Sequence, residues 1–362
     1  MNSLIKPRVS PLPLREQSIQ CRYREEEMLL RKKQGVRITA LFLLTIVGAI
    51  ASLWVGYYPL PARQVLHAFL AGVGFQVEVM PQAMTIFWSI RLPRILAALM
   101  IGGALAVSGS VYQGMFRNPL VSPDILGVSS GAGMGAAIAI FGGFPYWYTQ
   151  IFAFLGGIAA VSLSYFISTR SKHNQVLTLV LTGSMISALC NAVVTMIKYL
   201  SDPGDVLQQL TFWLMGSLTK VRMEGIALSA VPMAVGIVIV FAMRWRVNLL
   251  SLEDEEAISI GIPIRRDRLI LIFASTLLSA SAVCLGGLIG WVGLMIPHIC
   301  RALFGPDHKW LMPACTLMGG LYLMLMDNLA RSLLTMELPI GVVTAFIGAP
   351  FFVGLILRKK GG

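Results

Sequence analysis

Residues 117–135, "RNPLVSPDILGVSSGAGMG", carry the residue types that could most readily do chemistry, a turn-forming Arg-Asn-Pro followed by four glycines. A glycine-rich loop can cradle phosphate, but the Walker type requires a lysine after its last glycine, and this run contains none. A dinucleotide-binding loop requires a preceding strand, which the helical pattern described below excludes. Gly127, Gly131 and Gly135 recur every four residues and so share one helical face, which favours helix packing.

A second stripe of small residues has the same spacing: Gly102, Ala106, Ser110 and Gly114. In lipid, helices associate by close backbone approach at small residues, because no hydrophobic drive acts between them. We therefore expect two packing seams, meaning lines of small residues along which helices touch. Pro119 stops a helix between the two stripes, which predicts a cytosolic turn there.

The remaining reactive side chains indicate no metal site. The five cysteines are scattered, with no C-x-x-C motif and no clustered histidines, which is typical of apolar packing residues. His298, in "IPHICR", has the chemistry of a heme ligand but lies close to the predicted cytosolic end of a span. No nucleophile–base pair stands out either, so we expect a chain that is not an enzyme and binds no cofactor itself.

Composition places these motifs in a membrane. Of 362 residues, 56% are hydrophobic and 13% charged, whereas a soluble domain is about 25% charged. Apolar runs of about 20 residues recur along the chain and predict an all-α polytopic membrane protein with about ten transmembrane helices. The predicted spans are 36–57, 94–114, 126–144, 148–169, 176–199, 225–243, 269–287, 289–304, 313–331 and 340–357.

The segments outside these spans are polar or short. Residues 1–35 are predicted to be a cytosolic tail, with "YREEEMLLRKK" as a short surface helix, ahead of a transmembrane domain at 36–358. The tail is no cleavable signal peptide, because the apolar run that follows is too long and lacks a small-residue cleavage site. A short helix near "PARQVLHAFL" is expected in the outer connection 58–93, and Trp213 is expected to anchor the outer segment 201–222 at the membrane surface.

The net charge of +12 is unevenly distributed. All but seven of the 29 Lys and Arg residues lie on one side of the predicted topology. The seven on the other side are Arg63, Arg91, Arg94, Lys198, Lys220, Arg222 and Arg331. This asymmetry is the positive-inside pattern, so it predicts cytosolic termini and indicates no nucleic-acid partner.

Four blocks carry a family resemblance: "RLPR" (91–94), "GGALAVSGSVYQGMFRNPLVSPDILGVSSGA" (102–132), "GLIGWVGLMIPHICRALFGPDH" (287–308) and "LPIGVVTAFIGAPFF" (338–352). Over about residues 36–357 the chain resembles the FecCD-type permeases, the membrane subunits of bacterial ABC importers for iron–siderophores, heme and cobalamin. The resemblance implies the type II importer fold, with ten helices per subunit and two subunits around a central pathway.

The same resemblance implies the partners and the location. They are a cytosolic ABC ATPase that holds ATP and magnesium, a periplasmic or lipid-anchored binding protein, and a second permease subunit, identical or paralogous, in the bacterial inner membrane. Iron–siderophore is the favoured cargo because such systems are common, with heme and cobalamin as alternatives. An ion-coupled secondary carrier would need carboxylates near the membrane centre. Asp327 alone lies within a predicted span, near its outer end, which favours ATP as the energy source.

The segment "LLSLEDEEAISIGIPIRRDR" (249–268) predicts a short cytosolic helix. Ser251 suits its N-cap, acidic residues its first turn, Gly261 its C-cap and Pro263 its stop. The residues alone leave open a solvated loop helix or a helix that docks in a groove. The resemblance implies a coupling helix within 251–263 that contacts the ATPase through Glu253, Asp254, Glu255, Glu256, Ala257, Ile260 and Gly261. The family usually has glycine at the position of Glu253.

The outer arginines also have two interpretations. Arg91 and Arg94 flank Pro93 at the start of the second span, and Arg331 ends the ninth. They could contact lipid headgroups or cap helices, whereas the resemblance implies that they pair with glutamates of a binding protein. Asp327 lies four residues before Arg331, so a structural salt bridge is favoured over a proton relay.

The fifth span carries a mildly polar stripe, Gly183, Ser187, Asn191 and Thr195, which fits either interhelical hydrogen bonding or a pathway wall. The resemblance implies that the fifth and tenth helices line the pathway. The tenth contributes Gly341, Thr344, Ala345 and Gly348. A weakly polar wall suits a bulky chelate that must pass without sticking. His173 and Asn174, in the link "SKHNQV", are implied to lie near the inner gate.

Overall fold

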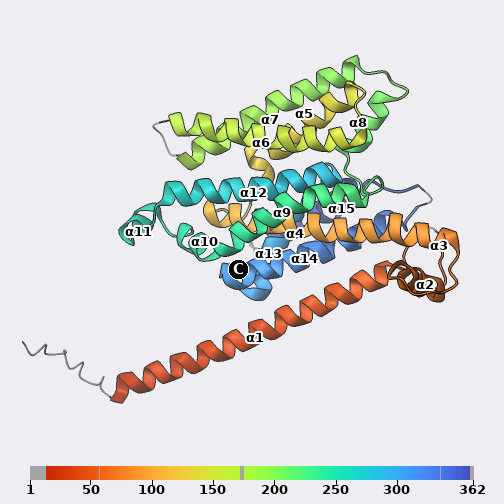
Figure 1. Ribbon diagram of the computed structural model, residues 1–362. Helices are drawn as coiled ribbons and strands as arrows, with labels where there is room; N and C mark the ends of the chain where they lie inside the picture. Colours follow the sequence, from red (N-terminus) through yellow and green to blue (C-terminus); the bar gives the residue numbers. More distant parts are fainter. Residues whose placement is uncertain (1–13, 57, 172–174, 335, 359–362) are drawn as a thin grey trace, which may run out of the picture.

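The computed structural model describes residues 14–56, 58–171, 175–334 and 336–358, which form helices and connecting loops (Figure 1). The helices are α1 (Leu14–Ser52), α2 (Ala62–Gly72), α3 (Pro81–Thr85), α4 (Leu92–Met115), α5 (Val128–Phe141), α6 (Tyr146–Arg170), α7 (Gln175–Leu200), α8 (Val206–Leu214), α9 (Met223–Ala242), α10 (Arg244–Leu250), α11 (Asp254–Ser259), α12 (Ile264–Gly286), α13 (Val292–Phe304), α14 (His308–Ala330) and α15 (Ile340–Arg358). A π-helical segment, Ile86–Arg91, leads into α4, and a 3-10 helix, η2 (Pro123–Leu126), precedes α5. The all-α fold class is confirmed.

The predicted spans match the helices in number and order. Within the described residues, seven helices are long and apolar enough to cross a membrane, and three shorter apolar helices accompany them. The shorter ones are Val128–Phe141, Val292–Phe304 and Ile340–Leu355. Each of the ten predicted spans coincides with one of these helices. Proline interrupts two of the short ones, at Pro297 and Pro350, which a membrane helix tolerates where neighbours satisfy the backbone.

Helices α4 and α12 form the centre of the bundle. α4 packs against α14, α12 and α13, and α12 also packs against α9 and α6 (Figure 1). The membrane-length windows of α4 and α12 are 83% buried, against 17% for α1. A helix surrounded on all sides needs small or apolar residues all round, which α4 has. α4 therefore defines two ends of the molecule: the Arg94 face, where it begins, and the Arg117 face, just after it ends.

Both predicted seams are packing surfaces. Gly102 contacts the backbone of Gly319 in α14 so closely that a Cβ has no room. Gly131 meets Gly156 of α6 in the same way. Gly127 departs from the prediction, because it ends η2 in the left-handed conformation, at φ 89°, and faces α7 instead of α6.

α1 starts inside the predicted tail. It is one continuous helix from Leu14 to Ser52, so the separate surface helix and the end at residue 57 were wrong. The boundary between tail and membrane domain at residue 35 falls within this helix and stays a prediction. The charged residues before Gly35 are good helix formers and join the apolar run without a break. The side chains of Gln34 and Arg37 donate to the last carbonyls of α13 and hold the middle of α1 against the bundle.

The second span also begins earlier than expected. The helix that starts at Pro81 continues through the π-helical segment into α4, so Arg91 and Arg94 lie inside a helix and not at its start. Pro93 fits there because the wider π turn before it already rearranges the backbone hydrogen bonds. The short helix expected near residues 61–70 is confirmed as α2.

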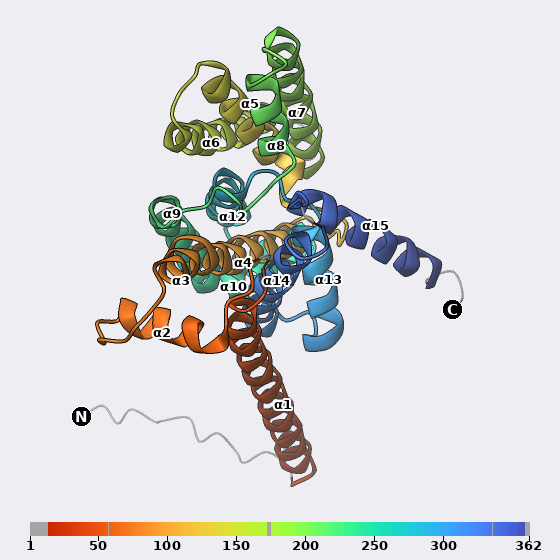
Figure 2. The same cartoon turned by 90° about the vertical axis from the view of Figure 1, so that its right-hand side faces the viewer.

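Helices α5 to α8 form a group on one side of α4 and α12, and α1 lies on the opposite side (Figure 2). α15 projects from the bundle in the same view. α7 exposes a row of apolar side chains: Leu177, Leu181, Met185, Leu189 and Met196. Trp213 was expected to anchor at the membrane surface, but it packs against the apolar cluster shared by α5, α6 and α12.

Candidate functional site

Charged side chains form a buried cluster at the Arg94 face. Arg94 Nη2 donates to Asp327 Oδ1 at 2.7 Å, and Arg94 Nη1 donates to both carboxylate oxygens of Glu337 at 2.9 Å. Arg331 Nε lies 3.5 Å from Asp327 Oδ2, which confirms the predicted pair. Arg94, Arg331 and Asp327 are at most 5% exposed. Because the pairs are desolvated, removing one partner leaves an uncompensated buried charge.

The same cluster is tied to the end of α1. Arg331 Nη2 donates to Ser52 Oγ at 2.8 Å. Arg91 donates to the carbonyl oxygens of Leu53 and Tyr58 at 2.5 and 2.6 Å. The structure therefore brings Arg91, Arg94 and Arg331 into one region, but it places all three in the interior, where their partners belong to this chain.

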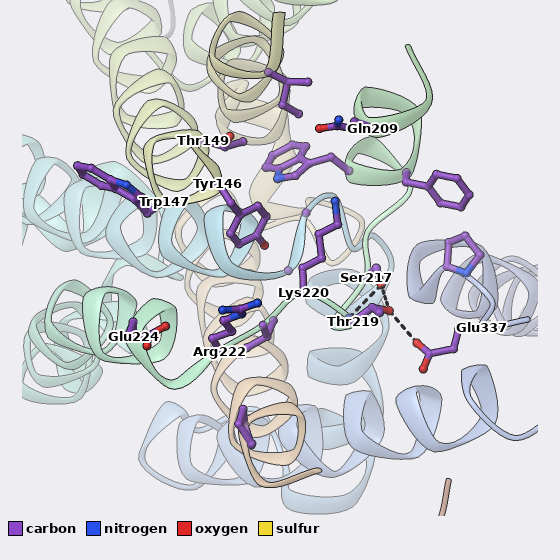
Figure 3. A pocket seen from close by; sticks show the side chains of 18 of the residues that line it. Tyr146, Trp147, Thr149, Gln209, Ser217, Thr219, Lys220, Arg222, Glu224 and Glu337 are labelled. Atoms are coloured by element: carbon purple, nitrogen blue, oxygen red, sulfur yellow. Dashed lines mark hydrogen bonds between the residues drawn. The ribbon is translucent and has the colours of Figure 1, made fainter. Parts of the chain in front are cut away.

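Glu337 connects the cluster to the loop between α8 and α9. Its carboxylate accepts a hydrogen bond from Thr219 Oγ1 at 2.7 Å as well as those from Arg94 (Figure 3). Partial burial raises the pKa of Glu337, but the Arg94 charge and the Thr219 hydrogen bond outweigh that effect, so the pKa lies below its usual value. Glu337 is thus held in its charged form.

A cleft of about 1460 Å³ opens beside this cluster, between the α5–α8 group and the bundle (Figure 3). Tyr146 and Trp147 of α6 line it, together with residues of α8. Lys220 and Arg222 also line it, and among the described residues neither has an ion-pair partner. Both side chains are exposed, unlike the buried arginines near them.

The short acidic helix lies at the Arg117 face. α11 spans Asp254–Ser259, and Gly261 follows it with a φ of 84°. The N–H of Ile262 reaches back to the carbonyl of Ala257 at 3.1 Å, so the predicted glycine C-cap is confirmed. Ile258 and Ile260 are 63% and 60% exposed on this face.

Two details of the predicted helix were wrong. The N-cap position belongs to Glu253, because Ser251 ends the preceding helix α10 and donates to the carbonyl of Val247 at 3.0 Å. Ala257 was expected at a docking surface but is 1% exposed and packs inward. α10 did not stand out in the sequence, because its seven residues mix cations with apolar residues without a clear period.

Asp254 fastens α11 to the rest of the molecule. Arg268 of α12 donates to both of its carboxylate oxygens, at 2.8 and 3.1 Å. Arg117, in the turn after α4, donates to Asp254 Oδ1 at 3.2 Å and to the carbonyl of Leu252 at 3.2 Å. Sequence reasoning missed both arginines, since Arg117 was considered only for topology and as part of a turn. The remaining acidic residues predicted for coupling, Glu253, Glu255 and Glu256, are exposed.

The polar stripe of α7 divides into two parts. Gly183 packs against the backbone of Ile125 in η2, and a Cβ on Gly127 would lie 3.2 Å from Ser187 Oγ. Asn191 and Thr195 are exposed, and Thr195 donates to the Asn191 carbonyl in its own helix. The two residues predicted near the inner gate, His173 and Asn174, lie outside the described residues.

The small residues of α15 face the bundle. Cβ atoms on Gly341 and Gly348 would lie 2.5 Å from the Met215 carbonyl oxygen and 2.7 Å from the Trp291 side chain. Thr344 is fully buried and donates to the Gly341 carbonyl at 3.0 Å. Ala345 is half-buried beside them.

His298 contacts the aromatic rings of Phe351 and Phe352. Within the described residues, no group of three or more His, Cys, Asp or Glu side chains could hold a metal ion.

Comparison with known proteins identifies the class. The chain is 40% identical to the molybdate import system permease protein MolB of Haemophilus influenzae, over 89% of this chain and 95% of that protein. It is 38% identical to the hemin transport system permease protein HmuU of Yersinia pestis, over 76% of this chain and 84% of the other. The solved structure of an inward-facing, putative metal-chelate type ABC transporter matches with a TM-score of 0.81 and 38% identity, covering 90% of this chain and 99% of that one.

A helical multi-pass protein with these relatives is a transport subunit, not itself an enzyme. The chain belongs to the FecCD transport family, whose sequence model matches residues 44–358. It is the permease of a binding-protein-dependent ABC importer of the bacterial type, which implies an ATPase and a binding protein as partners.

Proposed function

We propose that this permease carries a metal chelate, with iron–siderophore as the first candidate, across the bacterial inner membrane in an importer that a separate ATPase drives. The permease holds no cofactor of its own, and ATP and magnesium belong to the ATPase. The Arg117 face is cytosolic, with both termini on that side, and the Arg94 face is periplasmic. The concentration of Lys and Arg toward the Arg117 face supports this orientation.

The observation that carries the proposal is α11. It is a short helix whose acidic side chains and two isoleucines project from the molecule, while Asp254 and Ala257 hold it in place. An exposed pair of large apolar side chains on a charged face suits a groove in a partner. We assign residues 251–263 to the ATPase contact, with Ile258 and Ile260 inserted and Glu253, Glu255 and Glu256 at the rim.

A second permease subunit completes the pathway. The apolar row on α7 and the projecting α15 leave one side of the chain without packing partners among the described residues. We place the partner subunit there, with Asn191 and Thr195 toward the shared pathway. α15 packs against the bundle through its small residues, Gly341, Thr344, Ala345 and Gly348. These residues therefore affect the pathway indirectly, because they fix the position of α15.

We place the docking site of the binding protein on the periplasmic face. Buried Arg91, Arg94 and Arg331 hold that surface together: Arg94 and Arg331 pair with carboxylates of this chain, and Arg91 donates to backbone carbonyls, so none of the three is presented to a partner. Lys220 and Arg222 are accessible at the cleft, where carboxylates of a docked lobe would meet them. Rim charges of this kind steer association more than they add affinity.

The test is transport by the reconstituted complex. The permease, its ATPase and its binding protein in proteoliposomes should accumulate a ferric siderophore only with ATP, and mass spectrometry of the ligand copurified with the binding protein should find the same chelate. Deletion of residues 253–260 should abolish ATP-driven uptake. Uptake that survives this deletion, or proceeds without the ATPase, would overturn the proposal.

A second candidate cargo is an oxyanion. The relative MolB, named as a molybdate permease, is 40% identical over 89% of this chain, and a relative named for iron chelatin transport is 41% identical over 76%. Parallel uptake assays with molybdate and with a ferric chelate, in one preparation, separate the two cargoes.

A further inference from the structure

The turn after α4 contains a strained residue with an unusual set of contacts. Arg117 is one of two non-glycine residues with positive φ among the described residues, at 53°. Such a conformation costs about 1–2 kcal/mol and persists only where the surroundings impose it. Here the backbone at the end of α4 imposes it, because the N–H groups of Arg117 and Asn118 reach back to the carbonyls of Gly114 and Gln113, both at 3.2 Å. This turn directs the guanidinium of Arg117 to the Leu252 carbonyl and to Asp254, at the start of α11.

The chain from Arg117 onward is a stiff connection. Asn118 Oδ1 accepts from the N–H of Leu120 at 3.0 Å, which closes a local turn. Gln113 Nε2 donates to the carbonyl of Val121 at 3.1 Å and fastens the same segment to the end of α4. These bonds tie residues 117–122 to the end of α4.

This connection ends on the predicted pathway helix. Residues 123–126 form η2, and its Ile125 packs on Gly183 of α7 at backbone contact. Gly127 follows and approaches Ser187 Oγ. Gly183 and Ser187 belong to the polar stripe that leads to the exposed Asn191 and Thr195.

We propose that Arg117 is a positioning residue for transport: its ion pair with Asp254 passes the displacement of the coupling helix through residues 118–127 to α7. The inference rests on the proposed function of α11. Arg268 anchors the same carboxylate to α12, so α11 is attached to two elements. Breaking the Arg117 attachment leaves α11 seated on α12 but removes its side-chain bonds to the turn that leads into η2.

The test compares ATP hydrolysed with cargo imported, in proteoliposomes that contain the whole complex. Arg117→Gln should lower uptake about tenfold while ATP hydrolysis stays within about twofold of wild type, because contacts along a coupling route change coupling and not ATPase assembly. Arg117→Asn, which tolerates positive φ, should behave in the same way, and Arg117→Lys should restore part of the uptake. Arg266→Gln, which removes an exposed cation from the same face, is the matched control and should have no effect.

A double-mutant cycle establishes the pair. Asp254→Asn should also raise the ATP consumed per cargo, and the double variant with Arg117→Gln should be no worse than the worse single variant. Three results would each overturn the inference. They are a wild-type ratio of ATP hydrolysed to cargo imported in Arg117→Gln, an equal loss of uptake in Arg266→Gln, and additive effects of the two substitutions in the cycle. A wild-type complex that shows no ATP-driven uptake would instead overturn the proposed function, so the two failures are distinguishable.

Discussion

Two ion-pair clusters, built from arginine and acidic residues, lie at the two ends of α4. At the Arg94 face, Asp327 is 1% exposed between Arg94 and Arg331. At the Arg117 face, the side chain of Asp254 is 42% exposed between Arg117 and Arg268. The first cluster joins α1, α4 and α14 into one body, and the second fastens α11, whose isoleucines are exposed, to α12 and to the turn after α4. The carboxylate is therefore desolvated in the first cluster and open to solvent in the second.

The largest expected effect contrasts the two carboxylates. Asp327→Asn should lower the free energy of unfolding by about 3–5 kcal/mol, because two buried guanidiniums lose their shared charge partner. Asp254→Asn should cost less, about 1–3 kcal/mol, because Asp254 and Arg117 are open to solvent although Arg268 is buried. Thermal unfolding of both variants in the same detergent measures the difference, and equal losses would remove the distinction drawn between the clusters.

A change on the exposed side of α11 should affect transport alone. Ile258→Asp with Ile260→Asp should reduce ATP-driven uptake roughly tenfold or more, because the ATPase contact loses its apolar centre. Both side chains are largely exposed, so the melting temperature of the isolated permease should not change. Ile258→Val is the matched control, and a lower melting temperature in the Asp variant would show that α11 is structural.

The accessible cations beside the buried cluster should have a smaller, salt-dependent effect. Lys220→Glu with Arg222→Glu should slow association of the binding protein about tenfold at low ionic strength and much less at high salt. Surface plasmon resonance at two salt concentrations measures the rate constants. Arg63→Glu reverses an exposed cation outside the cleft and serves as the control; an equal slowing there would indicate a general charge effect.

The smallest effect is expected at Glu337, the half-exposed member of the buried cluster. Glu337→Gln should cost up to about 1 kcal/mol at neutral pH. Because the folded protein lowers the pKa of Glu337, its contribution exists above the unfolded pKa of about 4.3 and is lost as the pH falls through the lower folded value. Unfolding curves of wild type and variant should therefore converge in acid, and a constant gap would contradict the assignment.

Much of the architecture was predictable because a membrane constrains sequence strongly. The ten spans and the seams at Gly102 and Gly131 followed from apolar length and from small residues spaced by four. The boundaries of α1 and of the second span were not predictable, since one depended on polar helix formers before Gly35 and the other on a π-helical segment ahead of Pro93. Local propensity does not show where a continuous helix passes from solvent into lipid.

The candidate site also has features that could be predicted from the sequence and features that could not. By residue type and family resemblance, the sequence alone determined that the chain is a helical transport subunit with an acidic helix on one face and arginines on the other. Only the tertiary structure decided which of these charges are buried, that Arg94 and Arg331 share Asp327, and that Arg117 reaches Asp254. Side chains distant in sequence come into contact only after α4, α12 and α14 have packed. The desolvation of each charged side chain at these contacts decides whether it is confined to an internal ion pair or stays accessible.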